Sequence, residues 1–580
     1  MSSFFTLPAS QKKRKRAQKP DQENGIAGSK SKRRETRDES ISGSDSEEED
    51  NVPDREDFSH SDDESEEEEF ANEDPAAKRV RLAEQYLANT QKEVLLEEGF
   101  DAADVDQENL RRRMGERLKE DTAETRGRLY KWIADDMAWN RADQRMVRMD
   151  GKSITAVAIQ GQFVYTAGKD LSLSKWELPS SETPETEEET TKVRASKKPK
   201  RRAYTRGSQS RKNDRDYDQH TAAILCLAAS QDGKFVVTGG ADNKLIAWDA
   251  VTLKPLKVFT QHRDSVTGLA FRRGTNQLYS ASKDRTVKVW SLDELAYVET
   301  LFGHQDEVVD VGALAQEKCI TVGARDRTAR LWKVVEESQL VFRGGGAPSK
   351  PKPNHNASDD KPDVPIDPAM YKYNEGSTDR ITCIDDDTFL TASDNGSISL
   401  WSVHKKKPVY TLPLAHGLEP APPLTTLSAE KEPNPADVFQ SPAPRWITAL
   451  RAIPYSNVFV SGSWDGYVRV WRVTSDKRRI EALGPLECVD DEGLTTSRRV
   501  EGVINDLAID ERGDRGKEGI VVIAGVGKEP RLGRWRDIAG AKNGMAVFSV
   551  PRSVLVEDDA VDGPAAGAEK NDDAFEGFDD

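Results

Sequence analysis

Histidine and aspartate recur in this sequence at a fixed separation. Three histidines each precede an aspartate by 22 residues: His220 and Asp242, His262 and Asp284, His304 and Asp326. A histidine beside a carboxylate can act as a general base, and it can equally form a hydrogen bond that holds a turn. Because the three pairs stand in the same phrase of successive repeats, we expect them to hold turns.

No other residues have the spacing of a catalytic or metal-binding motif. The HExxH, GxSxG and P-loop patterns are missing. The cysteines form no CxxC motif and lie in predicted strands, where we expect core positions; they are Cys226, Cys319, Cys383 and Cys488. The sequence also has no apolar run of membrane-spanning length. We therefore predict a protein that is not an enzyme and has no metal, cofactor, small-molecule substrate or membrane partner.

The tryptophans place the histidine–aspartate pairs in a repeat. Trp248, Trp290 and Trp332 are 42 residues apart, and each closes the same phrase, as in Ser-Ala-Ser-Lys-Asp-Arg-Thr-Val-Lys-Val-Trp (280–290). This is the WD40 signature, in which each repeat forms one four-stranded blade of a β-propeller. Looser copies lead to four further tryptophans, Trp176, Trp401, Trp471 and Trp535.

Seven repeats predict a closed ring of seven blades, which leaves no sheet edge exposed. Two copies depart from the signature, because Asn395 and Glu529 stand where the aspartate belongs. We expect looser or specialised turns at these two positions. His404 and His416 lie near blades but outside the signature, and neither has an obvious partner.

The fold class is therefore all-β, a seven-bladed WD40 β-propeller at 146–555 preceded by a short helical segment at 74–145. Polar insertions at about 179–219, 344–376 and 413–443 explain the wide gaps between repeats. In the helical segment, one face carries Val80, Ala83, Leu87 and Val94, and a second stretch carries Leu110, Met114 and Leu118. The apolar faces of these helices can either pack on the propeller or dock on a partner.

The net charge of −17 hides an uneven distribution along the chain. Residues 1–37 hold 11 Lys or Arg against 3 acidic residues, whereas residues 38–74 hold 19 acidic residues against one Arg. We expect 1–73 and 556–580 to be disordered tails, since both are too polar to fold. Two basic clusters are typical of nuclear import signals: Lys12, Lys13, Arg14, Lys15 and Arg16, and then Lys32, Arg33 and Arg34.

Cations also flank the repeat turns. Since the paired His and Asp must meet, we expect the turns on one face of the ring, with their flanking residues projecting from it. Blades 7, 1, 2, 3 and 4 supply Lys528, Arg531, Lys169, Lys244, Lys283, Arg285, Arg325 and Arg327. A basic arc of this kind is the footprint of a phosphate backbone, which favours RNA or another polyanion as partner.

Two segments strengthen this prediction. The seventh repeat, Ala-Gly-Val-Gly-Lys-Glu-Pro-Arg-Leu-Gly-Arg-Trp-Arg (524–536), surrounds a Gly-rich turn with Lys528, Arg531, Arg534 and Arg536, and we place Arg534 in the strand leading to Trp535. Residues 192–215 hold eleven Lys or Arg. Such an arm can wrap phosphates, and it can equally be an import signal or a solvated loop.

The seventh repeat resembles the last repeat of the WD-repeat family of the U3 small nucleolar ribonucleoprotein. Lys-Arg-Val-Arg-Leu-Ala-Glu-Gln-Tyr-Leu (78–87) and the basic-then-acidic N-terminus are similar too. The resemblance implies a nucleolar protein that binds the box B/C element of U3 small nucleolar RNA with a kink-turn-binding protein. It further implies a role in early pre-ribosomal RNA processing for the small subunit, beside other small-subunit processome proteins.

By the same resemblance, Lys528, Arg531, Arg534 and Arg536 are the candidates for RNA or partner contact. The chain departs from the family at Pro530, where a histidine is expected. The alternative function is a nuclear WD40 scaffold that binds only proteins. Trp464 offers an aromatic anchor for such a partner, whereas the basic arc disfavours it.

Overall fold

The computed structural model describes residues 107–125, 127, 129–149, 151–179, 198–214, 216–344, 376–420, 442–489, 495–496, 499–513 and 516–553 of the chain. The two tails, the import clusters and the first expected helix lie outside these described residues. The second expected helical stretch lies in α2 (Gln107–Thr125).

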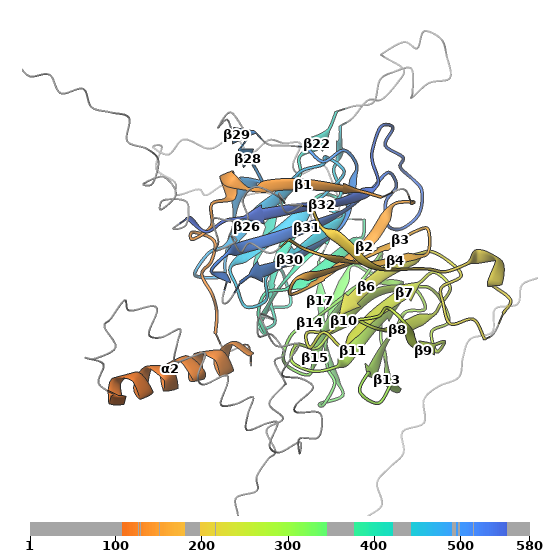
Figure 1. The fold of residues 1–580 in the computed structure, drawn as a ribbon, viewed down its shortest axis with the longest axis horizontal. Helices are drawn as coiled ribbons and strands as arrows, with labels where there is room; N and C mark the ends of the chain where they lie inside the picture. The colour runs from red at the N-terminus through yellow and green to blue at the C-terminus, as the bar shows by residue number, and fades with distance from the viewer. Residues whose placement is uncertain are drawn as a thin grey trace, which may run out of the picture. The chain divides into compact units, whose positions relative to one another are not determined.

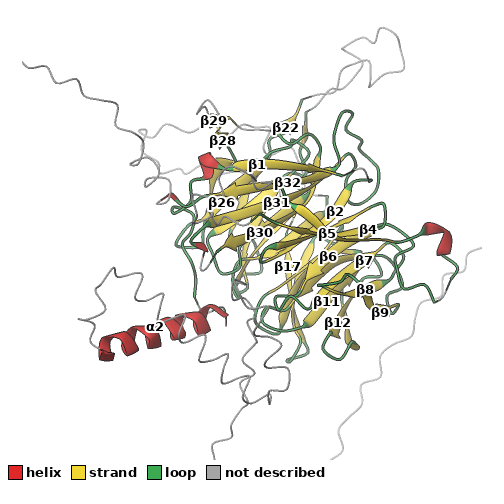
Figure 2. Ribbon diagram, viewed as in Figure 1, coloured by secondary structure: helices red, strands yellow, loops and turns green. Residues whose placement is uncertain are grey.

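The described residues form seven four-stranded antiparallel sheets, which are the seven blades (Figures 1 and 2). Blade 1 consists of β2 (Ile154–Gln160), β3 (Phe163–Gly168), β4 (Ser172–Glu177) and β5 (Lys200–Arg206). Blade 2 consists of β6 (Ile224–Ala229), β7 (Phe235–Gly240), β8 (Leu245–Asp249) and β9 (Pro255–Phe259). Blade 3 consists of β10 (Val266–Phe271), β11 (Gln277–Ser282), β12 (Thr286–Ser291) and β13 (Ala296–Phe302). Blade 4 consists of β14 (Val308–Ala313), β15 (Lys318–Gly323), β16 (Thr328–Lys333) and β17 (Ser338–Arg343). Blade 5 consists of β18 (Thr378–Cys383), β19 (Thr388–Ser393), β20 (Ile398–Ser402) and β21 (Tyr410–Leu412). Blade 6 consists of β24 (Ala449–Ala452), β25 (Val458–Gly462), β26 (Val468–Val473) and β27 (Ile480–Pro485).

Blade 7 joins strands from both ends of the described chain. Its strands are β30 (Val503–Arg512), β31 (Gly519–Gly527), β32 (Gly544–Val550) and β1 (Asp143–Arg148). β1 pairs antiparallel with β32, from Asp143 opposite Ser549 to Arg148 opposite Gly544, and lies beside it in Figure 1. This pairing closes the ring non-covalently and covers the edge of β32 that would otherwise be open.

The chain reaches the propeller earlier than the sequence suggested. β1 begins at Asp143, and residues 129–142 run along the blades with only the short turn η1 (Trp139–Arg141), so the predicted helical segment does not extend to residue 145. The backbone N–H of Lys131 donates to the carbonyl of Tyr455, and Trp139 is buried with its indole N–H on the carbonyl of Ala134. The first bond ties the segment to blade 6, and the second fixes Trp139 within the segment that leads into β1.

Large side chains fill the space between neighbouring blades. Trp290 of blade 3 is fully buried in a cluster with Leu245 and Phe259 of blade 2, and its ring centroid lies 4.7 Å from that of Phe259. Full burial of a large apolar side chain stabilises the folded state by about 1.5–3 kcal/mol, so these contacts hold the blades together.

The first insertion contains more regular structure than predicted. β5 and the short turn η3 (Gln209–Arg211) lie within 179–219, and β5 completes blade 1 by pairing with β4. The residues Lys200–Arg206 of the expected flexible arm are therefore a strand. Short two-stranded sheets join β22 (Leu418–Glu419) to β23 (Ala443–Pro444) and β28 (Cys488–Val489) to β29 (Thr495–Thr496).

Candidate nucleic-acid interface

The repeat histidines lie in buried hydrogen-bond chains. In blade 3, His262 Nδ1 lies 2.9 Å from Asp284, His262 Nε2 lies 2.7 Å from Ser280 Oγ, and Trp290 Nε1 donates to the same hydroxyl at 2.8 Å. A carboxylate only accepts, so Nδ1 donates to Asp284 and the Ser280 hydroxyl donates to Nε2. Asp284, His262, Ser280 and Trp290 thus form one series of hydrogen bonds inside the blade.

Blades 2 and 4 contain the same chain of residues. It runs Asp242–His220–Thr238–Trp248 in blade 2 and Asp326–His304–Thr321–Trp332 in blade 4. Burial alone would raise the pKa of the Asp242 carboxyl, but hydrogen bonds from His220 and the backbone of Thr221 hold it below its usual value. These side chains are engaged in the fold and offer nothing to a ligand.

A fourth chain of this kind occurs in blade 6, and the sequence search missed it. His416 Nδ1 lies 2.8 Å from Asp465, His416 Nε2 lies 2.8 Å from Ser461, and Trp471 donates to Ser461. His416 is therefore not a free histidine. The insertion at 413–443 stretches the separation between partners from 22 to 49 residues, which removed the signal.

Blade 7 departs most from the repeat. Trp535 does not close its third strand, because residues 528–543 form a loop between β31 and β32, the β31–β32 loop. Phe548 of β32 is buried between blades 6 and 7, as the repeat tryptophans are buried between theirs. Arg534 accordingly lies in the loop and not in a strand, which corrects both predictions.

Arg531 does not project from the face of the ring. Its residue is 7% exposed, and its guanidinium donates to the backbone carbonyl of Thr267 at 2.6 Å and to that of Val309 at 3.5 Å. These carbonyls belong to blades 3 and 4, across the ring from the loop. Burial lowers the pKa of the Arg531 guanidinium to about 10, with Arg380 adding repulsion.

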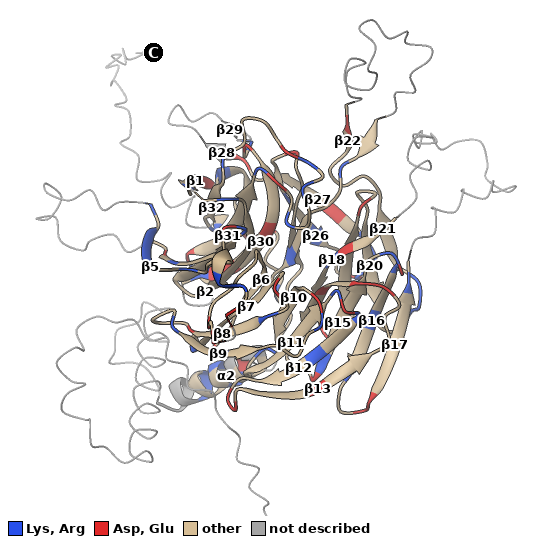
Figure 3. Ribbon diagram, turned by 90° about the vertical axis from the view of Figure 1, so that its right-hand side faces the viewer, with Lys and Arg blue, Asp and Glu red and all other residues tan. Residues whose placement is uncertain are grey.

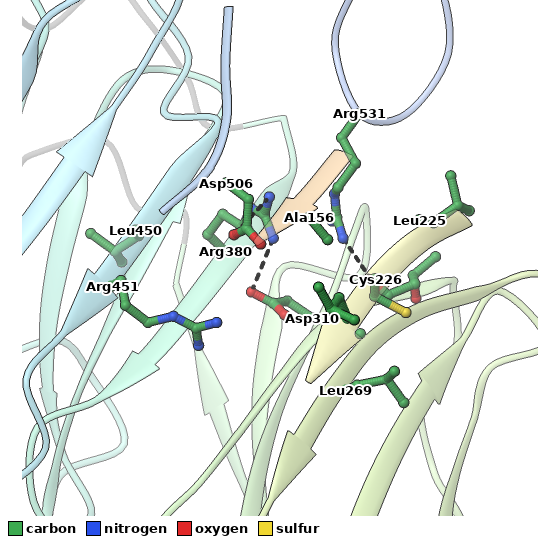
Figure 4. Close-up of a pocket in the computed structure, with 13 residues that line it drawn as sticks. Ala156, Leu225, Cys226, Leu269, Asp310, Arg380, Leu450, Arg451, Asp506 and Arg531 are labelled. Carbon is green, nitrogen blue, oxygen red and sulfur yellow. Dashed lines mark hydrogen bonds and ion pairs between the residues drawn. The ribbon is translucent and has the colours of Figure 1, made fainter. Parts of the chain in front are cut away.

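The cavity that receives Arg531 is the central channel of the propeller. Its lining includes residues from the first strand of every blade, among them Asp310, Arg380 and Asp506, and Figure 4 shows Arg531 entering from the loop. Arg380 lies 3.8 Å from Asp310 and 3.7 Å from Asp506. Two buried cations and two carboxylates thus compensate one another, and Arg531 anchors the loop over the channel.

The other predicted cations are split between exposed and paired positions. Lys528, Arg534, Arg285, Arg325 and Arg327 are exposed, and of these Arg534 also lies 3.5 Å from Glu529. Lys169 is paired with Glu529 at 3.0 Å and Lys283 with Glu307 at 3.1 Å, and the half-buried Lys244 donates to the carbonyl of Tyr217. The arc is therefore less continuous than the sequence indicated, and its exposed charges gather at blades 3, 4 and 7.

Three tryptophans meet beside the β31–β32 loop. The ring centroid of Trp535 lies 4.6 Å from that of Trp446 and 5.5 Å from that of Trp464. Arg536 lies over the Trp464 ring at 4.5 Å and forms a two-pronged ion pair with Glu419. Trp464 is only 5% exposed, so it is not the surface anchor that a protein-only scaffold would use.

Known proteins share this architecture. The model of the WD domain, G-beta repeat, matches residues 211–249, 253–291, 296–333, 370–402 and 435–472. Ribosomal RNA-processing protein 9 of Saccharomyces cerevisiae is 36% identical over 543 residues, covering 83% of this chain and 90% of its own. U3 small nucleolar RNA-interacting protein 2 of Homo sapiens is 37% identical over 478 residues, covering 82% of each chain. This chain belongs to the WD-repeat family of U3 small nucleolar ribonucleoprotein proteins.

A solved structure agrees with the family assignment. The chain described as "Structure of U3-55K" superimposes with a TM-score of 0.53 at 32% identity and covers 70% of this chain and 98% of its own. In this family member, Figure 3 shows a run of basic residues along β5 of blade 1. Arg201 stacks on Tyr204 at 5.0 Å and Arg202 pairs with Glu177, so part of this charge is already engaged.

The central channel of this U3-family chain has little room for a small ligand, whereas a pocket of about 280 Å³ lies between residues 129–137 and blade 7. The channel cavity measures about 20 Å³, far below the several hundred Å³ typical of small-molecule sites. Among the described residues, no three His, Cys, Asp or Glu side chains group as metal ligands, and no helix is long and apolar enough to span a membrane. Burial raises the pKa of the Cys226 thiol to about 12, which leaves it unreactive at neutral pH.

Proposed function

We propose that this protein is a component of the U3 small nucleolar ribonucleoprotein and supports early processing of pre-ribosomal RNA for the small subunit. In this proposal it acts in the nucleolus, binds the box B/C region of U3 small nucleolar RNA together with a kink-turn-binding protein, and contacts other small-subunit processome proteins. Its relatives in yeast and human carry names that refer to ribosomal RNA processing and to U3 small nucleolar RNA.

The observation that carries the proposal is the anchored β31–β32 loop. Arg531 holds the loop from inside the channel, so the loop can present Lys528 and Arg534 at fixed positions on the surface. Because the anchor is formed before binding, little conformational entropy is lost when the loop meets an RNA. Exposed cations on a preorganised loop supply the phosphate contacts that dominate affinity for nucleic acids.

Within the proposal the propeller is a scaffold and not a catalyst. Its buried histidines and carboxylates are hydrogen-bonded to one another, and its channel is filled by Arg531 and Arg380. A rigid ring with a small set of exposed cations suits recognition of a folded RNA–protein junction by shape and charge.

The test is a binding titration of the full chain with box B/C RNA, with and without the kink-turn-binding protein, over a salt series. We expect tight, salt-sensitive binding that requires the second protein. The double variant Lys528→Ala/Arg534→Ala should bind more weakly, and its slope of log affinity against log salt should fall by about 1 to 2, because each phosphate contact contributes about 0.7–0.9.

A matched control removes two exposed lysines at the outer strand of blade 2, Lys254→Ala/Lys257→Ala. This control should keep the affinity and the salt slope of the wild type. Binding no tighter than that to an unrelated RNA of equal length would contradict the proposal and favour the protein-only scaffold.

A further inference from the structure

Trp535 combines a fixed position with an exposed surface. Residue Trp535 is 48% exposed, although it packs against both Trp446 and Trp464. The Trp464 ring meets it nearly edge-on, with an interplanar angle of 76°, and the Trp446 ring is tilted by 38°. Two aromatic neighbours therefore hold the indole while half of the residue stays in contact with solvent.

The supports of Trp535 come from two other segments. Trp464 belongs to the turn of blade 6, and Trp446 follows β23 at the base of the insertion before blade 6. Arg536, next to Trp535, covers the Trp464 ring and is held by Glu419. Hydrogen bonds from Arg536 in turn hold the pKa of the Glu419 carboxyl below its usual value, so this pair stays ionised at neutral pH. The indole is thus presented by a rigid assembly and not by the loop alone.

Arginines lie near Trp535 in the loop and around Trp464, and the exposed Asp537 follows in the same loop. Arg534 and Arg536 flank Trp535 in the loop, Arg445 donates to the carbonyl of His416, and the stem of Arg499 lies against Gly466 beside Trp464. The acidic side chains that pair with these arginines are Glu419 and Glu529. A protein–protein interface has few charges around its aromatic core, whereas an aromatic ring framed by arginines suits a base with its phosphates.

We propose that Trp535 is a stacking site for one unpaired nucleobase of the bound RNA. The inference rests on the proposed RNA-binding function and adds the ligand class and the residue. The base lies on the exposed indole, while the exposed Arg534 contacts an adjoining phosphate. Stacking requires a π-face and no particular hydrogen-bond pattern, so the site selects an unpaired base over a paired one.

The experiment uses the full chain, the kink-turn-binding protein and box B/C RNA, in which each unpaired nucleotide is replaced in turn by an abasic one. Trp535→Ala should weaken binding by about 5- to 150-fold, the range for loss of one base–aromatic stack. Its salt slope should equal that of the wild type, because no phosphate contact is removed. Trp535→Phe should retain most of the affinity.

One abasic RNA should reproduce the loss, and Trp535→Ala should then bind that RNA as well as the wild type does. The matched control is Trp132→Ala, since Trp132 is 49% exposed and contacts Tyr130, away from the loop. Thermal melting of both variants checks that the fold is kept.

Equal affinity of Trp535→Ala and wild type for the intact RNA, with normal salt-sensitive binding, overturns the stacking site and leaves the proposed function standing. Loss of affinity without coupling to any abasic position also overturns it, and points to a protein contact. Absence of specific binding by the wild type removes both proposals.

Discussion

The turn of blade 6 and the β31–β32 loop of blade 7 occupy the same place in their repeats and use their polar residues in opposite ways. In blade 6, the side chain of Asp465 is 3% exposed and bonds to His416, which is fully buried. In blade 7, the equivalent Glu529 is partly exposed and pairs with Lys169 and, at 3.5 Å, with Arg534. One turn directs its charge inward and the other directs it to the surface.

The difference shows how a repeat protein separates stability from recognition. Removing one partner of a buried, paired charge lowers the free energy of unfolding by several kcal/mol. Such a charge is also out of reach of a ligand. A solvent-exposed ion pair contributes little to stability, and its members can change partner when RNA arrives. The β31–β32 loop of blade 7 is anchored inward through Arg531, which bonds to carbonyls of blades 3 and 4. Four predictions test this contrast.

The largest effect is expected from His416→Ala. The variant leaves the buried carboxylate of Asp465 without its imidazole donor, and the free energy of unfolding should fall by about 3–5 kcal/mol. Denaturant titration measures this fall. His404→Ala is the control, because His404 is exposed and lies 3.7 Å from the exposed Asp387. This substitution should change the free energy of unfolding by less than about 0.5 kcal/mol. Similar values for the two variants would break the contrast.

Arg531→Ala should lower the free energy of unfolding by about 2–3 kcal/mol, since it removes buried hydrogen bonds from a charged donor. The freed loop should also bind RNA more weakly at every salt concentration, with the slope unchanged. A decrease of the slope by about 1 would instead identify Arg531 as a phosphate contact. Arg531→Lys keeps the charge but loses the forked guanidinium, so its stability and RNA affinity should lie between those of the wild type and Arg531→Ala.

The pH dependence of blade 6 is expected to be smaller. Burial lowers the pKa of His416 below 6.5, so between that lowered value and 6.5 the unfolded chain binds the proton more readily than the folded one. Stability is therefore lost as the pH falls below 6.5. The stability gap between wild type and His416→Ala should narrow from pH 7 to pH 5, whereas His404→Ala should follow the wild type. A constant gap would mean that the imidazole titrates alike in both states.

The smallest effect on stability should come from Lys528→Ala/Arg534→Ala. Both side chains are exposed, so thermal or denaturant unfolding should change by less than about 0.5 kcal/mol although RNA binding falls. This combination sharpens the contrast with His416→Ala, which should destabilise the fold without altering the RNA affinity of the molecules that remain folded.

The sequence alone predicted those parts of the molecule in which local pattern and fold agree. The 42-residue spacing of Trp248, Trp290 and Trp332 and the pairs around His220, His262 and His304 follow from a blade that repeats its own short-range contacts. The number of blades, seven, could also be predicted, because the strands of each blade, apart from β1, are formed by residues close together in the sequence. The seventh repeat was also found, since its glycines and cations are contiguous in the chain.

Long-range placement was decided only by the tertiary structure. His416 finds Asp465 across an insertion, β1 completes a blade made by the other end of the chain, and Arg531 reaches carbonyls of blades 3 and 4. Trp535 resembled a repeat tryptophan by sequence, yet Phe548 fills the blade interface. A one-dimensional pattern records the type and spacing of residues, whereas burial, partner and exposure depend on which distant segments close the ring. For that reason the framework of this protein could be read from its sequence, and the division of its cations into anchor, ion pair and exposed contact could not.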